Sequence, residues 1–130
     1  IYTTAVPPAQ AAAIGAAIEV VRDEPWRRER VLALARRVHA ALVDESDNER
    51  LATPIVPVVV GDAAASLSLA EHLQDAGFLA PAIRPPTVAP GSARVRLSLR
   101  ADLEDADVDG LIRAVEVWRA ANTRSAARRG

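Results

Sequence analysis

Apolar residues recur at helical spacing through the first part of the chain. An alanine-rich run follows Pro7 and Pro8, two residues that can occupy a first helical turn, and continues to Val21. Pro25 interrupts the pattern, because a proline inside a helix removes a hydrogen bond and clashes with the preceding turn. We therefore expect a kink or break between Asp23 and Trp26. Helical spacing then resumes at Val31, Leu34, Val38, Ala41 and Leu42.

A charged stretch without any period, 44–50, predicts a loop, and the pattern beyond it changes. Thr53 to Val60 is β-branched and apolar, which predicts a strand whose two prolines place it near a sheet edge or a bulge. Asp62 can then cap a helix over 63–76. The residues expected on the inner face of that helix are Leu67, Ala70, Leu73 and Ala76.

Two further strands and a final helix complete the predicted order of elements. The strands are expected over 78–84 and 93–99, on either side of a rigid loop over 85–92. The apolar positions of the final helix are Val108, Leu111, Ile112, Val115 and Trp118. This order indicates an α+β fold, with a small three-stranded sheet covered by helices and preceded by a long interdomain helix. We expect a helical arm over 1–50, a small α/β domain over 51–122 and a disordered tail over 123–130.

The composition narrows the function classes. Half of the 130 residues are apolar, which suffices for one core, and the net charge of -1 disfavours a nucleic-acid binder. There is no cysteine, which fits a cytoplasmic protein, and no apolar run approaches the ~20 residues that cross a bilayer. The chain also lacks methionine and lysine. We therefore expect Ile1 to lie inside a longer polypeptide or to follow processing, and no lysine here can form a Schiff base.

Arginines gather around the predicted third strand. Arg94 and Arg96 share one strand face with Ser98, because side chains alternate along a strand. Taken alone, this face is more often a solvated surface than a site. The preceding loop favours a site, because Arg84 stands before two prolines that restrict the segment presenting Thr87. A preorganised guanidinium is suited to binding a carboxylate through two parallel hydrogen bonds.

A competing motif begins at Asp105, where the acidic spacing matches a calcium-binding EF-hand loop through Asp107, Asp109, Gly110 and Glu116. An EF-hand requires a helix before this loop, whereas here a strand precedes it and helical periodicity runs through it. The favoured interpretation is an acidic first turn that complements the helix dipole. Neither histidine has a partner at metal-ligand spacing, and we predict no metal site.

Four segments resemble the α-oxoamine synthases, a family of pyridoxal-phosphate enzymes of fold type I. They are Ile-Tyr-Thr-Thr-Ala-Val-Pro-Pro-Ala-Gln at 1–10, Thr-Pro-Ile-Val-Pro-Val-Val-Val-Gly-Asp at 53–62, Ile-Arg-Pro-Pro-Thr-Val at 83–88 and Ala-Arg-Val-Arg-Leu at 93–97. The resemblance extends from Ile1 to about Arg119 and maps to the C-terminal part of a family member. It implies a small C-terminal domain that closes over the active site of a homodimer, with the lysine-bearing domain upstream.

The resemblance also implies roles for particular residues. Arg96 matches the arginine that holds the amino-acid carboxylate, Thr87 a loop threonine near the reacting substrate, and Arg84 a loop arginine on the acyl side. Thr3 and Thr4 match a hydroxyl pair that reaches the cofactor phosphate, usually that of the neighbouring subunit. From local sequence alone, simple helix capping is the better interpretation of these two threonines.

The segment at 83–88 is most similar to family members that condense L-alanine with a pimeloyl thioester, from coenzyme A or a carrier protein, and release CO2. In that reaction pyridoxal 5'-phosphate acts as the electron sink. The resemblance therefore implies an acyltransferase of biotin synthesis, inactive without its lysine. Two alternatives stay open: a sister synthase that uses glycine or serine with another acyl-CoA, and a non-enzymatic anion-binding or calcium-binding module.

Overall fold

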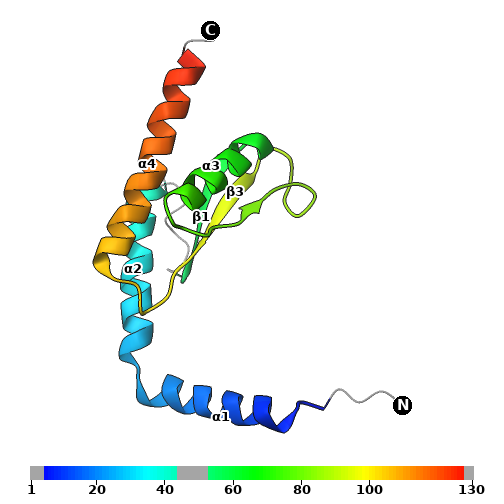
Figure 1. Ribbon diagram of the computed structural model, residues 1–130, viewed down its shortest axis with the longest axis vertical. Helices are drawn as coiled ribbons and strands as arrows, with labels where there is room; N and C mark the ends of the chain where they lie inside the picture. The colour runs from blue at the N-terminus through cyan, green and yellow to red at the C-terminus, as the bar shows by residue number, and fades with distance from the viewer. Residues whose placement is uncertain (1–4, 44–52, 128–130) are drawn as a thin grey trace.

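The computed structural model describes residues 5–43 and 53–127 (Figure 1). Its elements are α1 (Pro8–Asp23), α2 (Trp26–Leu42), β1 (Ile55–Gly61), α3 (Ala63–Asp75), β2 (Ala82–Ile83), β3 (Ala93–Ser98) and α4 (Asp105–Ala127). This confirms the predicted α+β order of elements. The predicted loop over 44–50 lies outside the described residues. No helix in the described ranges is long and apolar enough to span a bilayer.

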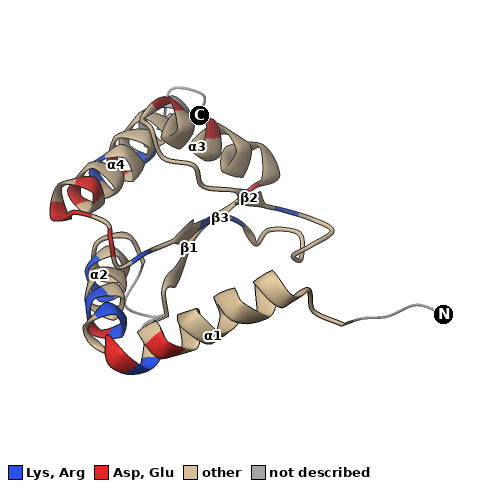
Figure 2. Cartoon of the chain, turned by 60° about the horizontal axis from the view of Figure 1, so that its bottom comes forward, with Lys and Arg blue, Asp and Glu red and all other residues tan. Residues whose placement is uncertain are grey.

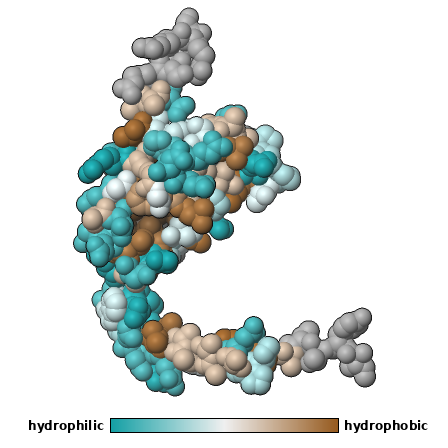
Figure 3. Space-filling view, viewed as in Figure 1, coloured by the Kyte–Doolittle hydropathy of each residue, from teal (hydrophilic) through white to brown (hydrophobic). Residues whose placement is uncertain are grey.

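The predicted break in the helical arm is confirmed. α1 starts with Pro8 in its first turn and ends at Asp23, where the Glu24 N–H still donates to the Val20 carbonyl at 2.9 Å. α2 starts directly after Pro25. α1 projects away from the other elements and buries none of its residues (Figures 1 and 3). Its exposed apolar residues include Ile14, Ile18 and Val21.

α2 belongs to the compact part of the molecule, although it lies within the segment predicted as an arm. Its stripe of Leu34, Ala35, Val38 and Leu42 is at most 3% exposed and packs into the core beside β1 and α4. The sequence pattern identified an apolar stripe but not the surface that covers it. The projecting arm is therefore α1, and the packed unit begins within α2.

The sheet is antiparallel in the order β1-β3-β2. β2 contains only two residues, far fewer than the seven positions predicted over 78–84. Pro81, immediately before β2, has no N–H and only accepts, from the Arg96 N–H at 3.0 Å. A second proline follows Arg84, so the ladder cannot extend in either direction without losing a donor.

One face of the sheet is buried and the other is open. Val56 and Val58 of β1 and Val95 and Leu97 of β3 are at most 2% exposed. They belong to one core with α2, α3 and α4, in which α2 and α3 contact the sheet and α4 contacts both of these helices. On the opposite face, Ile55 and Val59 remain about half exposed. The predicted inward set of β3, Val95, Leu97 and Leu99, is confirmed.

The inner face of α3 differs from the prediction. Asp62 caps the helix as expected, with its Oδ1 accepting from the Ala65 N–H at 2.9 Å. The buried residues are Ser66, Leu69 and Leu73, whereas Leu67 is 43% exposed and Ala76 is also exposed. Ser66 can enter the core because its hydroxyl donates to the Ala63 carbonyl at 2.8 Å and is therefore satisfied. A search for apolar residues alone does not find this face of α3, because one of its buried residues is a serine.

α4 carries its predicted apolar face and runs further than expected. Val108, Leu111, Val115 and Trp118 are buried, and the Trp118 indole donates to the Ser68 hydroxyl of α3 at 3.1 Å. The helix continues to Ala127, through much of the segment predicted to be a disordered tail. Alanines in this segment favour the helix, and residues 128–130 lie outside the described ranges.

We predict that Leu69→Ala lowers the free energy of unfolding by about 2–5 kcal/mol, because it opens a cavity beneath the sheet. Leu67→Ala, on the exposed side of the same helix, is the matched control and should change stability by less than about 0.5 kcal/mol. Urea unfolding of both variants measures the difference. Equal losses would contradict the helix face described above.

Candidate functional site

Arginine occupies the open face of the central strand. Arg94 is half-buried, and its Nε donates to the Ser92 carbonyl at 2.9 Å. Arg96 is exposed, and its guanidinium has no hydrogen bond or ion pair with any residue the structure describes. The backbone N–H of Arg96 is bonded within the sheet, so the rigid strand fixes its Cα. A backbone held in place and a guanidinium without a partner are the arrangement expected of an anion-binding arginine.

The loop after β2 forms a second cationic feature next to this face. Ile83 pairs with Arg94, so the chain leaves the sheet at Arg84, directly beside β3. The Thr87 N–H donates to the Arg84 carbonyl at 3.0 Å and closes a turn that contains the cis Pro85–Pro86 bond. Residues 82–87 line an open surface cavity of about 230 Å³. Arg84 and Thr87 line this cavity, and both residues are exposed.

Half of the other arginines whose side chains the structure describes have a carboxylate partner. Those with a carboxylate partner are Arg22, Arg27, Arg30, Arg37 and Arg100. In the same described ranges, neither Arg84 nor Arg96 has a side-chain partner. The positive charge around β3 and the 82–87 loop is therefore not neutralised within this part of the chain. It can attract a carboxylate, a phosphate or a thioester carrying either group.

The structure brings together only some of the predicted site residues. Arg84 and Thr87 share one cavity, while Arg96 lies on the neighbouring strand and is not among the residues that line it. Thr3 and Thr4 lie outside the described residues. Their predicted role is therefore a sequence-based expectation only.

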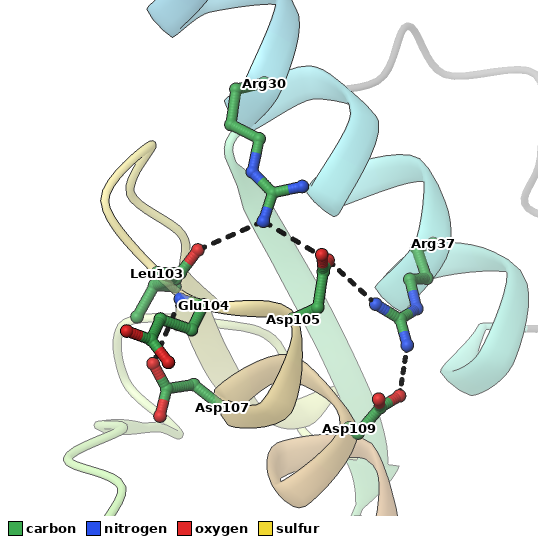
Figure 4. A network of polar contacts seen from close by, with 7 residues as sticks. All are labelled: Arg30, Arg37, Leu103, Glu104, Asp105, Asp107 and Asp109. Atoms are coloured by element: carbon green, nitrogen blue, oxygen red, sulfur yellow. Dashed lines mark hydrogen bonds and ion pairs between the residues drawn. The ribbon is translucent and has the colours of Figure 1, made fainter.

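The acidic motif at 105–116 has a structural explanation. Asp105 and Asp107 are in the first turn of α4, as the favoured interpretation required. Asp105 contacts Arg30 and Arg37 of α2, both at 3.2 Å, and Asp109 pairs with Arg37 (Figure 4). In Figure 2 the acidic start of α4 lies beside the basic stretch of α2. Two arginines thus pair with Asp105 and Asp109, two of the four carboxylates that resembled calcium ligands.

One feature of the site was missed by the sequence analysis. The open face carries a row of apolar residues on β1, Ile55, Pro57 and Val59, which pair with Ser98, Arg96 and Arg94 respectively. The sequence did indicate this row, because side chains alternate along a strand. With Val56 and Val58 buried, the residues between and beside them lie on the opposite face. The arginines of β3 therefore lie beside an apolar row.

Comparisons with known proteins define the family. The model of the family "Aminotransferase class I and II" matches residues 1–115. The chain therefore belongs to the aminotransferase class I and II family. It is 48% identical over 116 residues to an 8-amino-7-oxononanoate synthase of Methylobacterium sp. (strain 4-46). That match covers 88% of this chain, which spans 29% of the length of the relative.

Solved structures agree with this placement. A serine palmitoyltransferase of Sphingomonas wittichii superposes with a TM-score of 0.82 at 26% identity, over 93% of this chain and 31% of that one. An 8-amino-7-oxononanoate synthase of Francisella tularensis gives 0.72 at 20% identity, over 96% and 36%, and supports the fold alone. These likenesses confirm the resemblance to α-oxoamine synthases. The family depends on pyridoxal phosphate, which several of the similar solved structures contain.

The residues of this chain suit the substrate side of such a cofactor. The sequence has no lysine for a Schiff base, whereas the free guanidinium groups of Arg84 and Arg96 match an amino acid or acyl carboxylate. The hydroxyl of Thr87 adds a neutral donor beside Arg84. The free guanidinium groups and the neighbouring hydroxyl are therefore suited to recognising a substrate anion.

We predict that Asp105→Asn lowers the free energy of unfolding by about 0.5–1 kcal/mol, because it weakens two exposed ion pairs between α2 and α4. The effect should shrink in about 0.5 M salt, where such pairs are screened. Asp102→Asn is the control, since the partner of Asp102 among the described residues is its near neighbour Arg100. If calcium raised the unfolding midpoint of the unmodified chain and Asp105→Asn abolished that rise, the structural explanation of these carboxylates would be wrong.

Proposed function

We propose that this chain is the substrate-binding portion of an 8-amino-7-oxononanoate synthase. Such an enzyme condenses L-alanine with a pimeloyl thioester and releases CO2 and the thiol. One observation carries the proposal: Arg96 is exposed and unpaired within the described chain, on the open sheet face beside the Arg84–Thr87 loop. The 48% identity to a relative of that name supports the same assignment.

In this proposal Arg96 binds the carboxylate of the amino acid. Its two outer nitrogens donate to the two carboxylate oxygens, and this holds the scissile Cα–carboxylate bond in one orientation. Pyridoxal phosphate, when bound, supplies the electron sink for the carbanion. The contribution of the guanidinium is positioning and charge.

Arg84 and Thr87 act on the acyl side. The turn closed by the Thr87 N–H limits where both side chains can reach, and it places a cation and a hydroxyl around one cavity. A guanidinium there can bind an anionic group of the acyl substrate, and the threonine hydroxyl can donate to a carbonyl oxygen. The acyl thioester would then approach the amino acid from the loop side of β3.

The remaining parts of the proposal lie beyond the described residues. Thr3 and Thr4 contact the cofactor phosphate, with the site completed across a homodimer in the cytoplasm. The Schiff-base lysine comes from a large domain that α1 joins to the small domain, and this chain alone is inactive. The length of the relatives, of which this chain spans 29–30%, supports such a larger enzyme.

A sister synthase is the second candidate. The fold similarity to a serine palmitoyltransferase, with a TM-score of 0.82, favours it. Both a serine palmitoyltransferase and an 8-amino-7-oxononanoate synthase must bind the carboxylate of an amino acid. A sister enzyme would keep the role of Arg96 and change the amino acid and acyl chain. A non-enzymatic anion-binding module would keep only the free arginines.

The substrate pair is tested with the full-length polypeptide that carries this chain, supplied with pyridoxal phosphate. We expect thiol release from pimeloyl-CoA with L-alanine, and none above background from acetyl-CoA with glycine or palmitoyl-CoA with serine. Release from another pair would replace the substrate assignment by a sister activity. If no pair reacted, including L-alanine with a pimeloyl carrier protein, the enzymatic proposal would fail.

The role of Arg96 is tested by binding. In the same polypeptide, Arg96→Ala should weaken L-alanine binding about tenfold to a hundredfold, as loss of a charge-assisted bidentate pair predicts, and leave cofactor affinity nearly unchanged. Arg96→Lys should recover only part of the loss, because an ammonium lacks the planar fork. Arg36→Ala, an exposed arginine on α2, is the control. Unchanged L-alanine binding in Arg96→Ala would remove this residue from the site.

A further inference from the structure

Arg96 lies between two prolines, Pro57 of β1 and Pro81 immediately before β2. On one side its register partner is Pro57 of β1, and on the other its N–H donates to the Pro81 carbonyl at 3.0 Å. Pro57 is half-buried, while Arg96 is exposed on the same open face. A free cationic side chain thus has a rigid apolar ring as its direct cross-strand neighbour.

The hydrogen-bond pattern decides how close that neighbour is. Because the Arg96 N–H points toward β2, the Arg96–Pro57 pair is a non-hydrogen-bonded pair of the β1·β3 ladder. The Leu99 N–H confirms the phase, since it donates to the Pro54 carbonyl on the β1 side at 2.8 Å. In antiparallel sheets such pairs bring their Cα atoms and side chains closest together.

The same phase explains why a proline is tolerated within β1. In a non-hydrogen-bonded pair, the N–H position of residue 57 points away from β3. β1 is an edge strand, so that position faces no partner strand. Proline therefore removes no ladder bond at the position opposite Arg96.

We propose that Pro57 is a positioning residue for Arg96, an inference that rests on the proposed carboxylate-binding role. The ring packs against the aliphatic stem of the arginine, reduces its accessible rotamers and shields one side of the stem from water. Pro57 offers no side-chain donor or acceptor, so it does not compete with the substrate. The arginine side chain then loses less conformational entropy when its guanidinium binds a carboxylate.

Val59 provides a matched control on the same strand and face. It pairs with Arg94 rather than Arg96, and the Arg94 Nε is already bonded to the Ser92 carbonyl. Val59 is 47% exposed, so its truncation should disturb the core little. Any loss specific to Pro57 therefore reports on the Arg96 pair and not on the open face in general.

The test uses the full-length polypeptide with pyridoxal phosphate and follows L-alanine binding by absorbance. We expect Pro57→Ala to weaken L-alanine binding about threefold to tenfold, the range for one immobilised side chain, with the KM for pimeloyl-CoA unchanged. Val59→Ala should stay within about twofold of the unmodified protein. Pro57→Val, which restores a bulky neighbour, should recover most of the loss.

A double-mutant cycle separates positioning from a merely structural effect. In an Arg96→Ala background, Pro57→Ala should add no further loss of L-alanine binding. A loss that persists there, or an equal loss in Val59→Ala, would overturn the role of Pro57 and leave that of Arg96 intact. If Arg96→Ala itself had no effect on L-alanine binding, the proposed carboxylate site would fail, and the positioning role with it.

Discussion

One-sided burial of the central strand β3 governs the architecture. Val95 and Leu97 direct one row of side chains into a core shared by α2, α3 and α4, and the alternation of a strand then directs Arg94 and Arg96 to the other face. No helix of the described chain needs to cover that second face, because its central row is polar. The alternation of side chains along β3 therefore has two consequences. It packs the valine and leucine into the core that stabilises the domain, and it leaves the arginine side chains on the face where a ligand can bind.

The distribution of charge follows the same division. Arginines on α2 pair with the acidic start of α4 and join the two helices at the rim of the core. The arginines at 84 and 96 have no such counterion in the described part of the chain, although acidic residues are available elsewhere. A cation left unpaired on a rigid strand is suited to an external anion, and in the proposed arrangement Pro57 limits the motion of Arg96 without neutralising it.

Much of this could be predicted from the sequence. Periodicity located every element, the proline break and the inward row of β3, and the motif at 83–88 identified the cationic loop. The errors share one physical cause, since local pattern does not reveal what an element packs against. Ser66 is buried because its own helix satisfies it, α2 enters the core because β1 and α4 cover it, and β2 is shortened by the prolines around it. Likewise, the pairing of Pro57 with Arg96 required the register.

The central claim is that the open face of β3 meets the carboxylate of the amino acid. A crystal structure of the full-length polypeptide with pyridoxal phosphate and L-alanine tests it most directly. The account predicts two near-parallel N–H···O contacts of about 2.7–2.9 Å between the Arg96 guanidinium and the substrate carboxylate. A carboxylate held by other residues, with Arg96 directed into solvent, would contradict it.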